Sequence, residues 1–277
     1  MPELPEVETI RRGLERAVLG LKISKTEVLF PAMIKSGLNL IRRFPRKKIT
    51  SVERVGKHLL IKLEGKLCLV IHLGMSGKIL LLPKSSPLPR HTHLVIHFKE
   101  FAKKLCHNDP RRFGYIHAVT GDGLRNLDCL LKLGPDATQL TKKRFNQMVK
   151  VRHRMIKPLL LDQSFIAGLG NIYSDESLHK AKIHPRRLSH TLGPSQLDSL
   201  LIAIRTTLRQ AIVAGGSSLN DETYLNLDGD LGRFQLQLRV YGREKERCFH
   251  CGRKIRKIIV GSRSTYFCPH CQPAQKR

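Results

Sequence analysis

Apolar residues recur at helical spacing in two well-separated stretches of the chain. Near the start, Val7, Ile10, Leu14 and Val18 lie on one face of a helix that we predict over residues 5–19, with Gly20 as its stop. A second stripe predicts a helix over 195–214, which Gly215-Gly216 would end. This stripe contains Leu197, Leu200, Leu201, Ile204, Leu208 and Ile212.

Between residues 22 and 120 the pattern changes to short apolar runs that contain β-branched residues. The clearest runs cover 58–63, 66–75, 78–82 and 93–98, and Gly and Pro residues separate them. Several short strands joined by such turns predict a β-sandwich or barrel.

The helical pattern returns after Gly134-Pro135. A helical pair flanks the run Gly168-Leu169-Gly170-Asn171, and residues 217–238 have the irregular pattern of a loop. We therefore predict an α+β chain of three parts. These parts are a β-sandwich with an N-terminal helix over 1–135, a helical domain over 136–238 and a small C-terminal unit over 239–277.

The charge of the chain points to a polyanionic partner. Lys and Arg number 50 against 22 Asp and Glu, a net charge of +28, which a folded chain does not need for stability. DNA, RNA or an anionic membrane surface would bind such a surface, although a solvated basic surface without a ligand is the simpler alternative. The absence of Trp disfavours a platform for stacking single-stranded bases.

No apolar run approaches the roughly 20 residues of a membrane helix, and the first ten residues lack the apolar core of a signal peptide. An odd number of cysteines, seven, argues against a disulfide framework and for a reducing compartment. We therefore expect a cytoplasmic protein that neither spans a membrane nor is secreted.

Four of the cysteines have the spacing of a metal site. Two Cys-x-x-Cys pairs, Cys248 with Cys251 and Cys268 with Cys271, stand 16 residues apart. This spacing is typical of one structural Zn²⁺ held by four thiolates. The metal would replace a hydrophobic core that so short a segment cannot supply, and the basic residues between the pairs favour contact with DNA.

The first residues could carry covalent chemistry. Removal of Met1 would expose the secondary amine of Pro2, and an amine can attack an electrophilic carbon to form a Schiff base. Glu3 could serve as a proton donor. The simpler alternative, which the residues alone favour, is that Pro2, Glu3 and Glu6 only begin and cap the first helix.

A resemblance to a known family changes this balance. The start, Pro2-Glu3-Leu4-Pro5-Glu6-Val7-Glu8-Thr9, resembles that of the formamidopyrimidine-DNA glycosylases, bacterial enzymes that excise oxidised purines. Further motifs follow in the family's order, among them RVGKHLL, HLGMSG, DPRRFG, IKP, GLGNIY, VYGR and the four cysteines. The resemblance runs from residue 2 to residue 271, and it implies a monomer of the bacterial cytoplasm that is associated with the nucleoid.

The resemblance implies a β-sandwich, a helix–two-turn–helix domain and a zinc β-hairpin, together with specific catalytic roles. Pro2 would attack C1′ of the damaged nucleoside, Glu3 would protonate the sugar oxygen, and Glu6 would hold the N-terminal segment. Lys57 would donate a proton in β-elimination, and Arg263 would act in δ-elimination. By spacing alone, Lys57 would be a solvated lysine at a strand end and Arg263 one basic residue among many.

The resemblance also implies contacts with damaged double-stranded DNA. An enzyme that acts on a base in a duplex must flip the nucleotide out, and Met75, Arg111 and Phe113 would fill the gap. Without the resemblance, Met75 and Phe113 would be assigned to the core. The remaining DNA contacts that the resemblance implies are His72, His91, Arg152, Lys157, Asn171 and Tyr241. Arg152 stands where the family has Lys.

One segment departs from the family pattern. Asn220, Asp221 and Glu222 occupy the loop after Gly215-Gly216, where many members carry Lys or Arg. This departure leaves the exact base preference open, but not the class of reaction. Two alternatives to an enzyme for oxidised purines remain. One is a glycosylase of the endonuclease VIII type, which prefers oxidised pyrimidines, and the other is a non-catalytic zinc-containing DNA-binding protein of the same fold.

Overall fold

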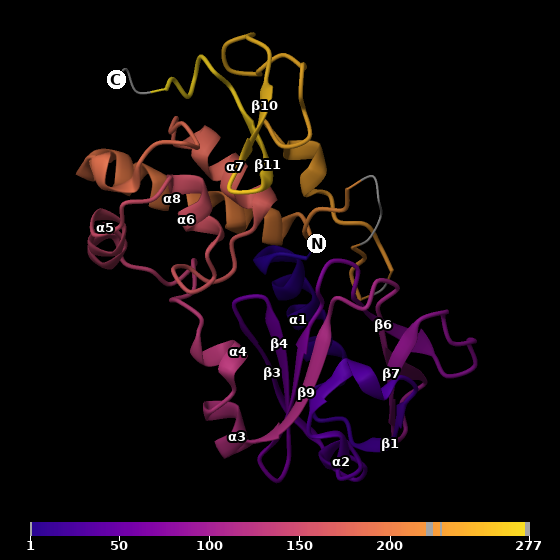
Figure 1. Cartoon of the computed structure of the whole chain (residues 1–277). Helices are drawn as coiled ribbons and strands as arrows, with labels where there is room; N and C mark the ends of the chain where they lie inside the picture. The colour runs from indigo at the N-terminus through magenta and orange to yellow at the C-terminus, as the bar shows by residue number, and fades with distance from the viewer. Residues whose placement is uncertain (1, 220–223, 228, 275–277) are drawn as a thin grey trace. The chain divides into compact units, whose positions relative to one another are not determined.

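The computed structural model describes residues 2–219, 224–227 and 229–274, and the chain divides into two compact units. Unit 1 comprises Met1–Leu131 and Ile212–Gln235, and unit 2 comprises Lys132–Ala211 and Leu236–Arg277. The chain therefore leaves unit 1 after its strands and returns to it after a long helix (Figure 1). The limits of the three predicted parts, 135 and 238, stay a prediction.

Unit 1 begins with helix α1 (Leu4–Val18), close to the predicted range. Glu3 is its N-cap, and Glu3 and Glu6 form a capping box in which each side chain accepts a hydrogen bond from the other residue's backbone N–H. The predicted apolar stripe, from Val7 to Val18, is buried. The helix thus packs through the face that the sequence pattern indicates.

Two sheets form the sandwich of unit 1. One has the strand order β1-β7-β8-β6 and the other β2-β9-β5-β4-β3, and among the described residues only the β2–β9 pair is parallel. The strands are β1 (Ile23–Val28), β2 (Ile34–Ser36), β3 (Ile49–Val55), β4 (His58–Leu63), β5 (Leu67–His72), β6 (Lys78–Pro83), β7 (Thr92–Phe98), β8 (Lys103–Asn108) and β9 (Tyr115–Thr120).

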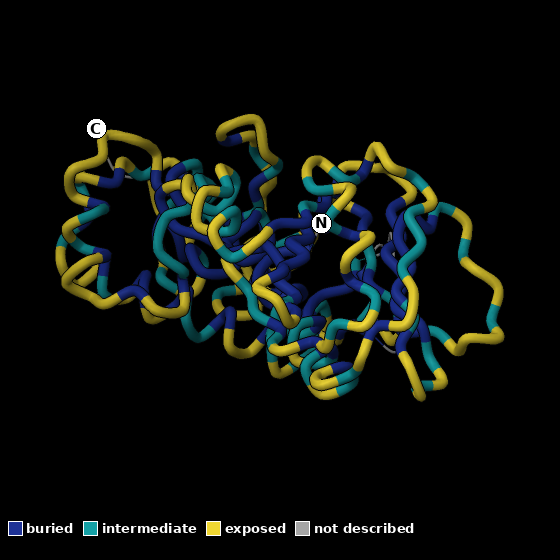
Figure 2. The backbone as a smooth tube through the Cα atoms, turned by 90° about the horizontal axis from the view of Figure 1, so that it is seen from below, coloured by how far each residue is buried: buried dark blue, intermediate teal, exposed yellow. Residues whose placement is uncertain are grey.

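Apolar side chains from both sheets and from α1 form one core. Leu94 and Leu105 come from the first sheet, Leu69 and Ile116 from the second, and Ile10 from the helix. Figure 2 shows the buried positions along the inner strands and helices and the exposed ones in the connections. Short elements complete the unit: η1 (Pro31–Met33), α2 (Leu38–Ile41), α3 (Gly121–Arg125), α4 (Asp128–Leu131) and η3 (Phe234–Gln237), of which the last crosses into unit 2.

Unit 2 consists of helices and one β-hairpin. The helices are α5 (Lys142–Lys150), α6 (Ile156–Leu161), α7 (Asn171–Lys180), η2 (Ser189–Thr191) and α8 (Pro194–Val213), whose last two residues belong to unit 1. Strands β10 (Arg256–Val260) and β11 (Arg263–Phe267) form the hairpin. Gly261 and Ser262 both have positive φ, +57° and +60°, as a two-residue hairpin turn requires.

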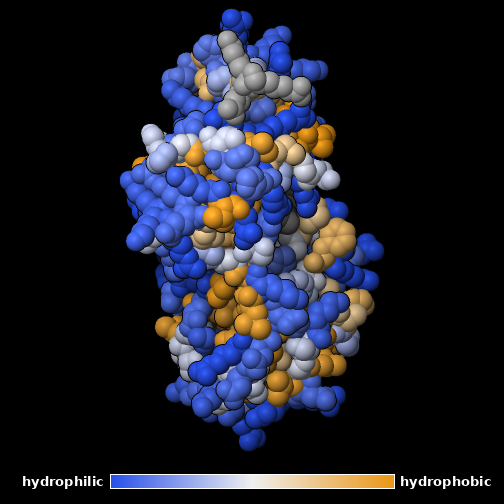
Figure 3. Space-filling model, turned by 60° about the vertical axis from the view of Figure 1, so that its left-hand side comes forward, coloured by the Kyte–Doolittle hydropathy of each residue, from blue (hydrophilic) through white to orange (hydrophobic). Residues whose placement is uncertain are grey.

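Within the described residues, no helix has the length and apolar character needed to cross a bilayer. The face drawn in Figure 3 is covered mainly by hydrophilic residues, with smaller apolar patches between them.

Candidate active site and metal centre

A buried carboxylate joins the start of α1 to a distant loop of unit 1. Glu6 is 1% exposed, and its Oε2 accepts a hydrogen bond of 2.8 Å from the backbone N–H of Glu3. Its Oε1 accepts another of 2.8 Å from the N–H of Ser217. Pro2 and Glu3 are buried beside it. The segment that would carry the nucleophile is therefore held at a defined position relative to the loop that follows α8.

The loop after α8 is closed by its own hydrogen bonds. The Tyr224 hydroxyl donates to the carbonyl of Gly215 at 3.0 Å, and the Ser218 hydroxyl donates to the carbonyl of Tyr224 at 2.7 Å. Gly216 has φ +86° and lies against both Glu6 and Tyr224. Residues 220–223, where the sequence departs from the family pattern, lie outside the described residues.

Lys57 lies in the turn between β3 and β4 and is 7% exposed. Aromatic and imidazole rings surround that end of the sheet. The Nε2 atom of His58 lies 2.8 Å from the Tyr115 hydroxyl, and the His72 ring stacks on Tyr115 with centroids 4.9 Å apart. Burial lowers the pKa of His58 to about 4 and that of His72 to about 3, and the charge of Lys57 acts in the same direction. Both rings are therefore neutral at pH 7.

The neutral His72 ring has a defined tautomer. Its Nδ1 accepts a hydrogen bond of 3.2 Å from the backbone N–H of Gly74, so the ring proton is assigned to Nε2. His72 can consequently donate one N–H from Nε2 without carrying charge. His91, the other histidine expected to contact DNA, is half-buried and has φ +67°, and its carbonyl accepts from the N–H of Asp109 at 3.1 Å.

Asp109 joins the two loops that carry the predicted insertion residues. Its Oδ1 accepts from the Ser76 hydroxyl at 2.5 Å, and its Oδ2 accepts from the N–H of Gly114 at 2.8 Å. The Ser76 oxygen accepts in turn from the N–H of Arg111 at 3.2 Å. The loop of Met75 is thereby fixed beside the loop that follows β8.

The predicted insertion residues are exposed on these loops. Met75 is 36% exposed and Phe113 is 55% exposed, which excludes the alternative that they pack in the core. The Arg111 guanidinium carbon lies 4.8 Å from the centre of the Phe113 ring. The structure therefore brings a flexible apolar side chain, an aromatic ring and a guanidinium together on one edge of unit 1.

In unit 2, a second buried carboxylate organises the entry to the zinc segment. Glu176, on α7, is 5% exposed and accepts hydrogen bonds from the three successive backbone N–H groups of Arg239, Val240 and Tyr241, each at 2.9 Å. Asn171 begins α7 as predicted, and its Nδ2 lies 3.5 Å from the Tyr241 hydroxyl. Asn171 and Tyr241, two of the expected DNA contacts, are thus neighbours.

The surroundings of Lys157 differ from those expected of a residue that contacts DNA. It is fully buried, and its Nζ lies 2.7 Å from the Asp175 carboxylate, 2.8 Å from the Thr265 hydroxyl and 3.0 Å from the carbonyl of Ser264. Because protein oxygens take all three ammonium hydrogens, this geometry does not fit a direct phosphate contact. Lys157 instead ties α6 and α7 to β11. Arg152, which precedes α6, is exposed as a phosphate contact requires.

Arg263 is exposed at the first position of β11, directly after the hairpin turn. The hairpin is anchored on α7, because the Asp175 carboxylate accepts from the N–H of Tyr266 at 2.9 Å. Gly261 in the turn approaches Pro158 of α6 so closely that a Cβ atom there would lie 3.0 Å from the proline ring. The tip that presents Arg263 is therefore supported by two helices.

The four predicted metal-binding cysteines converge. Their Sγ atoms all lie within 4.8 Å of one another, with 3.9 Å between those of Cys248 and Cys271 and 3.4 Å between those of Cys251 and Cys268. A tetrahedron with Zn–S bonds of about 2.3 Å has sulfur–sulfur distances of about 3.8 Å. The cluster therefore fits a four-coordinate metal ion, and it is the one such group found among the described residues.

Comparison with known proteins agrees with these features over the length of the chain. Residues 1–116 match the formamidopyrimidine-DNA glycosylase N-terminal domain, and residues 131–223 match the helix–two-turn–helix domain of the same enzymes. Residues 245–274 match a zinc finger found in these enzymes and in isoleucyl-tRNA synthetases. A formamidopyrimidine-DNA glycosylase from Pelotomaculum thermopropionicum is 43% identical over 276 residues, 98% of this chain and 99% of the relative.

The chain belongs to the formamidopyrimidine-DNA glycosylase family.

Other members of the family are similarly close. The relative from Cytobacillus firmus is 40% identical over 98% of this chain and all of its own length. The solved complex of wild-type Lactococcus lactis Fpg (MutM) with DNA containing N7-benzyl-Fapy-dG has a TM-score of 0.91 and 38% identity, covering 99% of this chain and 100% of that one. A MutM complex with carbocyclic 8-oxo-G DNA has a TM-score of 0.89. The predicted family and fold class are thereby confirmed.

Two residues that organise this family site were not singled out from the sequence. Asp109 lies inside the DPRRFG motif, where attention falls on the arginines and the phenylalanine. Glu176 lies in a helix whose residues from Ile172 to Leu178 are all buried. The signal that could have identified Glu176 is a pair of adjacent acidic residues in an otherwise uncharged stretch of helix, within a strongly basic chain.

Proposed function

We propose that this chain repairs DNA by base excision, removing oxidised purines such as 8-oxoguanine and formamidopyrimidines and then cleaving the strand as a lyase. The observation that carries the proposal is the N-terminal segment, in which buried Glu3 and Glu6 hold Pro2 at the start of α1 in a chain that resembles this family throughout. A capping box would begin this helix in any protein, but the bond from the Ser217 N–H to Glu6 also ties the N-terminal segment to the loop after α8, which helix capping does not require.

The first steps follow from the amine of Pro2. Once Met1 is removed, the Pro2 nitrogen attacks C1′ of the damaged nucleoside, and the base leaves with its bonding electrons and takes up the proton that the amine loses. The resulting aminal becomes an iminium when the C1′–O4′ bond breaks. Glu3 donates a proton to the sugar ring oxygen as the ring opens. Glu6 holds both residues by its hydrogen bond to the Glu3 backbone, so its role is positional.

Strand cleavage follows because the iminium acidifies the sugar. Loss of a C2′ proton expels the 3′ phosphate by β-elimination, for which Lys57 is the proton donor. A second elimination expels the 5′ phosphate, and Arg263 acts in this step. The burial of Lys57 and the exposure of Arg263 at a braced hairpin tip support these two different roles.

The exposed loops of unit 1 support nucleotide flipping. Met75 and Phe113 wedge into the base stack, and Arg111 hydrogen-bonds the base left without a partner. Phosphates are bound by His72, His91, Arg152, Asn171 and Tyr241. Lys157 is not among them, because its ammonium is saturated by protein oxygens, and we assign it a positioning role.

The four cysteines would hold one Zn²⁺. Bound zinc would supply the folding free energy of the hairpin and no chemistry of the reaction. We also propose that the chain acts as a monomer on damaged duplex DNA in the bacterial cytoplasm, at the nucleoid. Elemental analysis of the purified protein and its elution volume in gel filtration check the metal and the monomer.

Oxidised pyrimidines are the second candidate substrates. One solved structure similar to this chain is a Lactococcus lactis Fpg complex with DNA containing an oxidised pyrimidine, with a TM-score of 0.90. Residues 220–222, which differ from the usual family pattern, belong to the loop with which family members cover the flipped base. A panel of duplexes, each with one defined lesion, ranks the two classes of substrate by single-turnover rate.

Borohydride trapping tests the proposal directly. The processed protein should form a covalent adduct with a duplex that contains 8-oxoguanine. A version with an N-terminal tag, in which the Pro2 nitrogen is an amide, should bind the same duplex without forming the adduct or cutting the strand. Cleavage by the tagged, unprocessed protein would refute the role of Pro2.

A further inference from the structure

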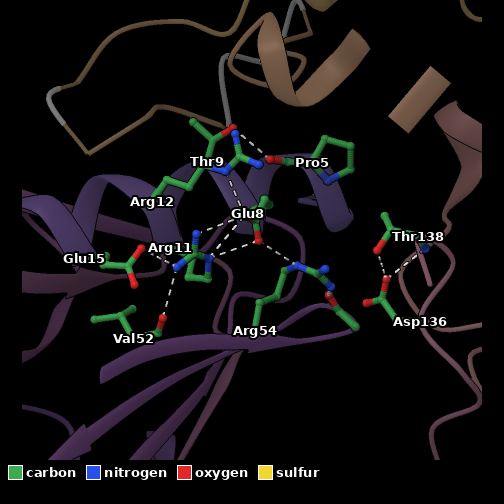
Figure 4. Close-up of polar contacts among 11 residues, drawn as sticks. Pro5, Glu8, Thr9, Arg11, Arg12, Glu15, Val52, Arg54, Asp136 and Thr138 are labelled. Atoms are coloured by element: carbon green, nitrogen blue, oxygen red, sulfur yellow. Dashed lines mark hydrogen bonds and ion pairs between the residues drawn. The ribbon is translucent and has the colours of Figure 1, made fainter. Parts of the chain in front are cut away.

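One carboxylate of α1 lies among three arginines, outside the residues assigned so far. Glu8 accepts hydrogen bonds from Arg11 at 3.2 Å, from Arg12 at 2.8 Å and from Arg54 at 3.1 Å (Figure 4). Its side chain is 13% exposed. Burial raises the pKa of Glu8, but the hydrogen bonds from the three arginines outweigh it and hold the pKa below its usual value. Glu8 is therefore ionised at pH 7.

The three arginines are not equivalent. Arg12 is 54% exposed and donates a hydrogen bond to Glu8 of the same helix. Arg54 comes from β3, its side chain is 9% exposed, and its Nε donates to Glu8 across the gap between strand and helix. Figure 4 shows Arg54 rising from the sheet toward the carboxylate. Glu8 and Arg54 thus form a nearly buried bridge between residues 46 apart in sequence.

Arg54 makes a second contact that leads toward Lys57. Its Nη1 donates a hydrogen bond of 2.8 Å to the carbonyl of Gly56, which has φ +56° and immediately precedes Lys57. A single guanidinium therefore binds Glu8 on one side and the backbone of the β3–β4 turn on the other. Only a planar group with several N–H donors can make both contacts.

The sheet alone does not set the position of Lys57 relative to Pro2. Pairing of Val55 with His58 closes the β3–β4 turn, but it leaves open how the turn lies against α1. Arg11 adds a bond from α1 to the carbonyl of Val52 at 3.2 Å, further back along β3. Of these two contacts between α1 and β3, the Glu8–Arg54 bridge lies nearer the turn.

We propose that Glu8 and Arg54 are positioning residues for strand cleavage, which hold the Lys57 ammonium at the sugar that is covalently bound to Pro2. This inference rests on the proposed function. Neither residue touches the substrate. Their effect passes through the Gly56 carbonyl to Lys57, so their loss should slow β-elimination and spare formation of the Schiff base.

The test uses the processed full-length protein and a duplex with a preformed abasic site, which removes base recognition from the measurement. Arg54→Lys keeps the charge but cannot span both partners. Under single-turnover conditions it should lower the rate of β-elimination by about ten-fold to a hundred-fold, the scale expected for a misplaced catalytic group. The yield of borohydride-trapped adduct at early times should stay within about two-fold of wild type, since the same principle leaves a correctly placed amine unaffected.

Three further variants separate positioning from loss of structure. Arg12→Lys alters the same Glu8 carboxylate without touching the turn, and it should behave as wild type in both assays. In a Lys57→Ala background, Arg54→Lys should have no further effect on elimination, because its action passes through Lys57. Glu8→Gln, which keeps the shape of the side chain, should reproduce the Arg54→Lys result if that variant folds poorly.

The outcomes divide clearly. Wild-type rates of elimination for both Arg54→Lys and Glu8→Gln would overturn the inference, and so would a loss of adduct in parallel with elimination. A further loss in the Lys57→Ala background would also overturn it, because the pair would then act elsewhere. Failure of the wild-type protein to form any adduct would overturn the proposed function itself.

Discussion

Gly216 lies where the loop after α8 meets the start of α1, and a side chain has no room there. A Cβ atom there would lie 2.9 Å from Cε1 of Tyr224 and 3.0 Å from Oε1 of Glu6. Its φ of +86° also disfavours any residue with a Cβ. The loop and the Glu6 carboxylate are therefore in direct contact, and a disturbance of one should reach the other.

We predict that Gly216→Ala slows base excision more than Gly215→Ala does. Gly215 has a similar φ of +74° but no atom within 4 Å of its Cβ position. Gly215→Ala should therefore strain the backbone without a steric clash. Each variant should lose about 1–3 kcal/mol of stability from the strained backbone. Only Gly216→Ala should also displace Glu6. Single-turnover excision of 8-oxoguanine measures the difference, and equal rates for the two variants would contradict it.

His107 is a second residue whose surroundings predict a measurable effect, on the pH dependence of stability. It is fully buried in β8, and neither ring nitrogen has a hydrogen-bond partner in the described part of the chain. Burial lowers the pKa of His107 to about 4; the nearby His93 acts in the same direction and Asp109 opposes it. The neutral ring is favoured in the folded state, because the unfolded pKa is about 6.5.

The sign of the pH dependence follows. The contribution of His107 to the free energy of unfolding is fully present above pH 6.5. It is lost as the pH falls from 6.5 toward 4, because the unfolded chain then binds a proton that the folded chain does not. Between pH 6.5 and 5, His107→Phe should remove about 1–2 kcal/mol of the loss in unfolding free energy. The full slope of about 1.36 kcal/mol per pH unit applies only once the unfolded imidazole is mostly protonated. Urea unfolding at several pH values measures this. His58 and His72 share the sign, so some loss should remain, but parallel curves for variant and wild type would refute the assignment.

At the scale of the elements, helix α7 is organised by two acidic residues that face inward. Asp175 holds Lys157 and the backbone of Tyr266, and Glu176 holds the backbone from Arg239 to Tyr241. One helix thereby fixes both the entry to the zinc segment and its hairpin. Burial raises the pKa of both carboxyl groups, and their hydrogen bonds oppose that rise.

Breaking the buried ion pair on one side should be more costly than replacing both partners. Lys157→Met leaves the Asp175 carboxylate without its counter-ion, and we expect a loss of about 3–5 kcal/mol. In the double variant Lys157→Met/Asp175→Asn, the amide oxygen still accepts from Tyr266 and no charge is buried, so much of that loss should be recovered. Thermal unfolding of the three proteins tests this. A single variant as stable as wild type would contradict it.

The elements themselves were largely predictable, because their patterns are local. Helices expected at 5–19 and 195–214 occur at Leu4–Val18 and Pro194–Val213, and the run at 58–63 is strand β4. The predicted four-cysteine cluster also forms. Strand order was not predictable: β5 lies between β4 and β9, and β9 pairs with β2 at the edge. Apolar periodicity shows which face of a strand is buried and not which strand it pairs with.

The contacts that organise the site were not predictable for the same reason. Glu6 binds Ser217, Glu8 binds Arg54 and Lys157 binds Thr265 across 211, 46 and 108 residues. Lys157 is instructive, because the resemblance to the family implied that it contacts DNA. A lysine between an isoleucine and a proline gives no sign of burial, and only the fold brings Asp175 and Thr265 to it. The DNA contacts of the other predicted residues stay predictions.

At the scale of the whole molecule, the net charge of +28 sets how firmly DNA is held but not what is done to it. Each phosphate contact contributes about −0.9 to the slope of log K against log salt concentration. If only electrostatics mattered, the loss of any exposed arginine would weaken DNA binding by the same amount. Arg111 and Arg263, one on each unit, offer a direct comparison, since both are exposed and each carries one charge.

We predict that Arg111→Ala and Arg263→Ala differ although they remove the same charge. The Arg111 guanidinium stacks on the Phe113 ring, in the loop that Asp109 fixes by hydrogen bonds. Loss of Arg111 should therefore slow excision and weaken discrimination between bases opposite the lesion. Arg263 stands at the hairpin tip, so its loss should reduce the salt slope by about one unit and let the β-elimination product accumulate. A gel that resolves β from β,δ products, with salt-titrated binding for each variant, measures both effects. If the two variants share product ratio, slope and opposite-base profile, the arginines act only as a common positive surface, and the division of roles between the units is wrong.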